Sequence, residues 1–108
     1  MIALVTDKRA EVAALCERYG VRQLDLFGSA TTGAFDPATS DLDFIMDFID
    51  YGPGVASRFI GFGDALEALF GRRVDVITEP TRRNPYFWAA VNESRQVIYE
   101  VSVPSPLL

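Results

Sequence analysis

Segments with helical and strand periodicity alternate along the chain, and this alternation limits the possible fold more than any other feature. Apolar residues recur at helical spacing over residues 7–19 and again from Val55 to Leu69, and a third helix is expected to begin at Pro85 with Asn84 as its cap. Strand-like apolar runs occupy residues 21–27, 41–48, 73–78 and 96–101. The pattern predicts an α/β (α+β) layer protein in which helices pack against a small central sheet.

The length of 108 residues allows one domain, expected over residues 1–100 and followed by a tail at 101–108. No leader segment and no long apolar stretch is evident, so we expect a cytoplasmic protein without a membrane partner. The single cysteine, Cys16, has no partner for an internal disulfide and lies on the apolar face of the first helix, where it reads as a core residue.

Two compositional features exclude whole classes of function. The chain has no histidine, which excludes Ser-His-Asp and Cys-His catalysis, imidazole zinc sites and histidine-dependent ribonucleases. Its net charge of −5 disfavours direct binding of a nucleic-acid backbone. Chemistry in this chain therefore depends on carboxylates, hydroxyls and bound metal.

Asp41 and Asp43 stand at the start of the apolar run "DLDFIMDF". Side chains alternate across a strand, so both carboxylates are expected on one face, with Leu42 and Phe44 on the other. Two like charges this close are costly unless a cation lies between them. Magnesium, which takes one or two carboxylates together with phosphate oxygens, is the natural candidate and points to nucleotide chemistry.

Two further features fit the same chemistry. Gly28 and Ser29 follow a strand, where a short helix presenting backbone N–H groups and the serine hydroxyl could bind phosphate, although an ordinary capped turn explains them equally well. Asp75 lies within the strand-like "VDVI" and offers a third carboxylate. Its alternative role is an ion pair with Arg72 or Arg73.

The stretches "LFGSATTG", "SDLDFIMDF", "GRRVDVIT" and "NPYFWAAVNESRQVIYE" occur in the order and spacing typical of one family. As a set they resemble the minimal nucleotidyltransferase family of the DNA polymerase beta superfamily. The resemblance implies that family's fold, with a small mixed central sheet. It also implies that Gly28 and Ser29 bind a triphosphate, that Asp41 and Asp43 bind magnesium, and that Asp75 completes the metal site and helps to activate the attacking hydroxyl.

Many members of this family are antitoxins encoded beside a HEPN-type ribonuclease toxin. They silence the toxin by binding it, and some transfer AMP from ATP to a toxin tyrosine. The resemblance therefore implies ATP as substrate, a HEPN-type toxin as partner and a hetero-oligomer. The alternative is an antitoxin that acts by binding alone, whereas an antibiotic-modifying enzyme is disfavoured by the short chain.

The chain departs from the family pattern after Gly28-Ser29, where many members carry an arginine and this sequence has Ala30, Thr31 and Thr32. A triphosphate would lose a cationic contact at this point. The basic residues considered as replacements for this contact are Lys8, Arg9, Arg72 and Arg73.

Tyr86, Phe87 and Trp88 form an aromatic cluster early in the last expected helix. Packing in the core accounts for one or two of them, and an exposed anchor at a partner interface is the alternative.

Overall fold

A computed structural model describes residues 3–32, 36, 38, 40–78 and 85–101. Its elements run in the order α1 (Ala3–Thr6), α2 (Arg9–Tyr19), β1 (Val21–Phe27), α3 (Ser29–Thr32), β2 (Leu42–Phe48), α4 (Val55–Phe70), β3 (Val74–Thr78), α5 (Pro85–Ser94) and β4 (Gln96–Glu100). Most expected elements are therefore present.

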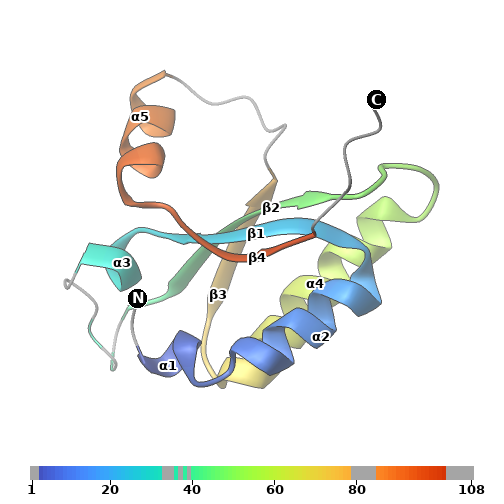
Figure 1. The fold of residues 1–108 in the computed structure, drawn as a ribbon, viewed down its shortest axis with the longest axis horizontal. Helices are drawn as coiled ribbons and strands as arrows, with labels where there is room; N and C mark the ends of the chain where they lie inside the picture. Colours follow the sequence, from blue (N-terminus) through green and yellow to red (C-terminus); the bar gives the residue numbers. More distant parts are fainter. Residues whose placement is uncertain (1–2, 33–35, 37, 39, 79–84, 102–108) are drawn as a thin grey trace.

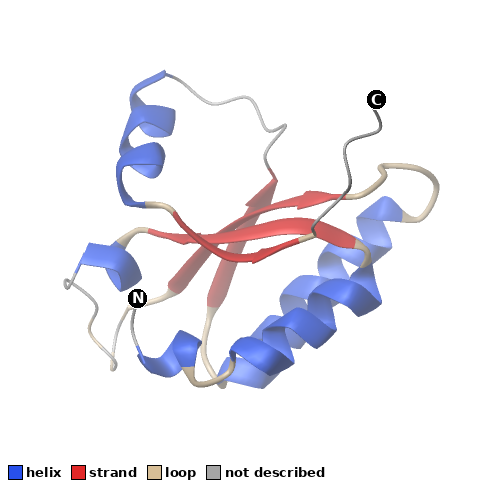
Figure 2. Cartoon of the chain, in the orientation of Figure 1, coloured by secondary structure: helices blue, strands red, loops and turns tan. Residues whose placement is uncertain are grey.

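The strands form one mixed sheet in the order β3-β2-β1-β4 (Figure 2). The β1 strand pairs antiparallel with both β2 and β4, whereas β2 and β3 are parallel. A parallel pair needs a crossover connection, and α4 supplies it. The prediction of an α+β domain with a small mixed central sheet is confirmed.

The two longest helices, α2 and α4, lie together against one side of the sheet, and α5 lies on the other side (Figure 1). The core fills the space between these two helices and the sheet. Its strand residues include Leu24, Leu26, Phe44 and Met46, all fully or almost fully buried, and they pack with Val12, Cys16, Phe62 and Leu66 of the helices. Every second residue of β2 therefore faces the core, which leaves the intervening positions for the opposite face.

Cys16 is fully buried, as expected, and burial raises the pKa of its thiol to about 12. The α2 helix ends at Gly20, whose φ of 72° belongs to the left-handed region that glycine adopts easily.

Element boundaries differ from expectation by one or two residues. The α2 helix begins at Arg9, two residues later than expected, after Lys8, which has a non-helical φ of −113°. The short helix α1 lies before the expected helix and was not predicted. The β2 and β3 strands begin at Leu42 and Val74, one residue later than expected. The cap at Asn84 and the tail at 102–108 lie outside the described residues. None of the described helices has the length and apolar character required to cross a membrane.

Candidate functional site

The structure brings Asp43 and Asp75 together on adjacent strands. The two residues are direct register partners in the parallel β2–β3 pair, so both side chains leave the same face of the sheet. Asp41 lies immediately before β2, two residues from Asp43, while Leu42 and Phe44 are fully buried on the core face. The alternation expected from the sequence places the three aspartates at one end of the sheet.

Their charges act on one another. The pKa of Asp43 is raised from 3.8 to about 6, first by partial burial and then by the negative charges of Asp75 and Asp41. The carboxylates are therefore close enough to repel, and a bound cation would relieve that repulsion.

These carboxylates do not form a complete metal cage. Within the described residues, no three acidic or cysteine side chains converge closely enough to hold a metal ion by themselves. Magnesium seldom requires such a cage, since it retains water and takes its remaining ligands from substrate phosphates. Two or three neighbouring carboxylates at an open end of a sheet fit that mode of binding.

Asp75 is exposed and forms no ion pair within the described residues, so its alternative role as a partner of Arg72 or Arg73 is not supported. Arg73 instead lies beside Asp41, with 3.9 Å between Nη1 and Oδ2. Arg72 donates to the backbone carbonyl of Ser40 at 3.3 Å.

Gly28 lies directly against the carboxylate of Asp43. It follows Phe27, the β1 register partner of Asp43, and has a φ of 77°. A Cβ at this position would stand 2.7 Å from Oδ2 of Asp43. Both the backbone conformation and the approach of Asp43 therefore require glycine here.

The backbone of Gly28 is held on both sides. Its N–H donates to Oγ of Ser94 at 3.2 Å, and its carbonyl accepts from the backbone N–H of Thr31 at 3.0 Å and from Oγ1 of Thr31 at 2.8 Å. Ser29 then begins the short helix α3, as the sequence suggested. Within the described part of the chain, the Ser29 hydroxyl has no hydrogen-bond partner.

The four basic residues considered as substitutes for the absent arginine lie in different places. Arg9 donates to the carbonyls of Ile98 and Val97 on β4, at the sheet edge opposite β3. Lys8 lies between α1 and α2. Arg72 and Arg73, by contrast, precede β3 and contact the segment that leads into Asp41. These two arginines are the candidates for a phosphate contact.

The aromatic residues of α5 differ in how exposed their side chains are. Tyr86 is 86% exposed, which contradicts a core role for this residue, whereas Trp88 is partly buried. The side chain of Phe87 lies outside the described residues.

A buried ion pair on the face of the sheet that carries Asp43 was not predicted from the sequence. Asp25, in the middle of β1, is only 1% exposed and accepts from Nε of Arg95 at 2.7 Å. Gln23 also donates to its carboxylate, at 3.0 and 3.1 Å. An aspartate inside the apolar run "LDLF" was the available signal, but a partner 70 residues away leaves no local pattern.

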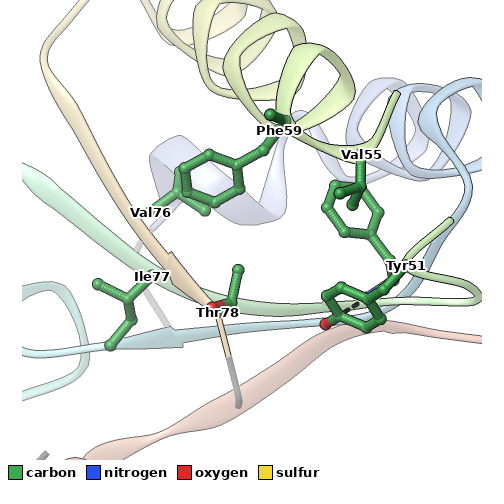
Figure 3. A pocket seen from close by; sticks show the side chains of 8 residues that line it. Tyr51, Val55, Phe59, Val76, Ile77 and Thr78 are labelled. Carbon is green, nitrogen blue, oxygen red and sulfur yellow. Dashed lines mark hydrogen bonds between the residues drawn. The ribbon is translucent and has the colours of Figure 1, made fainter. Parts of the chain in front are cut away.

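A separate hollow of about 480 Å³ lies at the other end of β2 and β3 (Figure 3). Phe59 and Val55 of α4, Tyr51, and Val76 and Thr78 of β3 line it. Val76 and Thr78 are register partners of two core-facing residues of β2, whereas Asp43 and Asp75 leave the opposite face of the sheet. This apolar hollow is therefore distinct from the acidic site.

Comparison with known proteins finds a family match over most of the chain. The profile of the nucleotidyltransferase domain family matches residues 12–98. The protein adenylyltransferase MntA of Thermococcus cleftensis is 35% identical over 85 residues, which cover 79% of this chain and 80% of that protein.

Solved structures show the same fold. A toxin–antitoxin complex with AMP-PNP contains a chain with a TM-score of 0.66 at 16% identity, covering 86% of this chain and 73% of that one. A complex of a tri-AMPylated HEPN toxin of Shewanella oneidensis with its MNT antitoxin gives a TM-score of 0.62 at 12% identity, covering 90% and 73% of the two chains.

Proposed function

The chain belongs to the nucleotidyltransferase domain family, and we propose that it transfers AMP from ATP to a tyrosine hydroxyl of a HEPN-type toxin. In this role it acts as an antitoxin and uses magnesium as cofactor. The proposal is supported by a relative that is a protein adenylyltransferase and by fold neighbours in complexes that contain AMP-PNP or an AMPylated HEPN toxin.

The observation that carries the proposal is the juxtaposition of Asp43, Asp75 and Gly28. Two carboxylates in register lie beside a glycine turn at which an added Cβ would stand 2.7 Å from Oδ2 of Asp43. These carboxylates would hold magnesium next to a turn suited to phosphate, and magnesium in proteins takes one or two carboxylates together with substrate phosphates.

The residues have separate tasks in the proposed reaction. Gly28 allows the triphosphate to approach Asp43, and the Ser29 hydroxyl donates to a phosphate oxygen. Asp41, Asp43 and Asp75 would hold magnesium, which would supply positive charge that stabilises the phosphate oxygens. Asp75 lies on the edge strand β3 and is exposed, and it orients the incoming hydroxyl, whose proton passes to a carboxylate or to solvent.

The chemical step is an in-line displacement at the α-phosphorus of ATP. The acceptor oxygen forms a bond to this phosphorus, the bond from phosphorus to the bridging oxygen of the β-phosphate breaks, and pyrophosphate leaves. The protein contributes mostly position and electrostatic stabilisation of the developing charge.

A partner protein suits this chain as the acceptor. The domain is a single sheet with helices and carries a net charge of −5, which complements a basic, RNA-binding partner.

A second candidate function is neutralisation of the toxin by binding alone. It is favoured by Ala30, which is buried and occupies the stretch where many members of the family carry arginine. The catalytic proposal then depends on Arg72 or Arg73 as the source of positive charge.

Intact-mass measurement of the partner distinguishes the two functions. The purified protein is incubated with its HEPN partner, ATP and magnesium, with Asp43→Asn as the matched inactive variant. The proposal predicts mass increases in whole AMP increments, located on tyrosine by peptide mapping, with the wild type only. An unmodified partner that still loses its ribonuclease activity would establish neutralisation by binding.

A further inference from the structure

We propose that Ser94, at the end of α5, is a positioning residue that holds the proposed phosphate-binding turn, Gly28-Ser29, against Asp43. The inference rests on the proposed function and adds a residue to it. Its basis is the 3.2 Å hydrogen bond from the Gly28 N–H to Oγ of Ser94, which joins residues 66 positions apart.

Glycine gives the turn its close approach but also the greatest conformational freedom of any residue. A rotation about Gly28 would change the distance between Ser29 and Asp43, and with it the geometry of any phosphate held between them. Contacts from other residues must supply the restraint that a side chain would normally provide. Ser94 restrains the N–H of Gly28, and Thr31 restrains its carbonyl.

The hydrogen bonding of Ser94 has a defined direction. A serine hydroxyl has one proton, and Oγ of Ser94 donates it to the carbonyl of Val91 at 3.5 Å. A lone pair of the same oxygen then faces the N–H of Gly28. Alanine at this position would remove the acceptor, whereas threonine would retain it.

The segment that carries Ser94 is itself anchored on both sides. Val91, three residues earlier, is only 3% exposed. Arg95, the next residue, donates to the buried Asp25 at 2.7 Å, and Asp25 lies on the same strand as Phe27. Ser94 is thus fixed to β1, which ends at Phe27 directly before Gly28, so it can hold the turn rather than move with it.

The hydrogen bond between Gly28 and Ser94 is tested first without nucleotide. The backbone amide of Gly28 is followed by ¹H–¹⁵N NMR and hydrogen exchange in the wild type, Ser94→Ala and Ser94→Thr. Loss of the acceptor should speed exchange of this amide about 3- to 10-fold in Ser94→Ala and leave it near the wild-type rate in Ser94→Thr. Ala90→Ser is the matched control, because it places a hydroxyl at an exposed position one turn earlier on α5. Equal exchange rates of the Gly28 amide in all four proteins would show that Ser94 does not restrain the turn.

The consequence for the site is measured by calorimetric titration with AMP-PNP in the presence of magnesium. Ser94→Ala should bind about 3- to 10-fold more weakly, with Ser94→Thr and Ala90→Ser within about twofold of the wild type. A wild type that binds AMP-PNP and a Ser94→Ala variant that binds it equally well would overturn this inference alone. A wild type that binds none would overturn the proposed function and the inference together. A purely structural role would lower the melting temperature of Ser94→Ala and leave its affinity unchanged.

Discussion

Replacing Asp43 with asparagine should stabilise the metal-free protein at neutral pH. The pKa of Asp43 is raised from 3.8 to about 6 in the folded protein by burial and by the charges of Asp75 and Asp41. Between these two pH values the folded state binds more protons than the unfolded state, so the free energy of unfolding falls as the pH rises. This contribution to stability is fully present below pH 3.8 and is lost as the pH rises through about 6.

The size of the effect follows from the two pKa values of Asp43. Each pKa unit corresponds to about 1.4 kcal/mol, so a difference of roughly two units sets an upper limit of about 3 kcal/mol. Because the carboxylate is only partly buried, solvent screening reduces this to about 1–2 kcal/mol. Asparagine cannot ionise and should escape this cost.

Urea unfolding in the presence of EDTA measures the difference in the free energy of unfolding between Asp43→Asn and the wild type. At pH 7.5 the Asp43→Asn protein should exceed the wild type by about 1–2 kcal/mol, and near pH 4 the two should agree within about 0.5 kcal/mol. Asp64→Asn, at an exposed position of α4, controls for the loss of one negative charge and should change stability little at either pH. Destabilisation of Asp43→Asn by about 1–3 kcal/mol at pH 7.5 would show that this carboxylate has a structural role and would refute the reasoning.

Three further outcomes are expected. Magnesium and ATP together should raise the melting temperature more than either ligand alone. A melting temperature with both ligands no higher than with one of them would argue against a shared site. Gly28→Ala should lose about 2 kcal/mol of stability together with its nucleotide affinity, because the added Cβ would stand 2.7 Å from Oδ2 of Asp43 at a positive φ. Gly63→Ala is the control: no atom lies within 4 Å of the added Cβ, so stability and affinity should match or exceed those of the wild type. Arg95→Met should cost about 3 kcal/mol in urea unfolding by leaving the buried Asp25 without its cation, and a loss below about 1 kcal/mol would contradict this view of the pair.

The helices and strands were largely predictable because their signals are local. The alternation in β2 predicted that Leu42 and Phe44 face the core and that Asp43 faces away, and the structure agrees. Apolar spacing likewise predicted α4 from Val55, and the glycine at position 20 predicted the end of α2. In each case a few neighbouring residues determine the outcome.

The contacts within the site were less predictable because they join distant segments. Register between β2 and β3 brings Asp75 beside Asp43, and no local pattern specifies that register. The hydrogen bond from Gly28 to Ser94 and the ion pair from Arg95 to Asp25 each connect β1 to the end of α5. The exposure of Tyr86 was not predictable either, since the apolar character of an aromatic residue does not reveal whether other elements of the fold cover it.

Labelling the partner from ATP that carries ³²P at the α- or the γ-phosphate tests nucleotidyl transfer most directly. Wild-type protein, magnesium and the proposed HEPN partner should give a labelled partner from α-labelled ATP and none from γ-labelled ATP, whose label should appear in pyrophosphate. The same reaction with Asp43→Asn should lose the signal by orders of magnitude while the complex still forms. Label retained from the γ-phosphate, or no label from either ATP in a complex that forms normally, would contradict nucleotidyl transfer at this site.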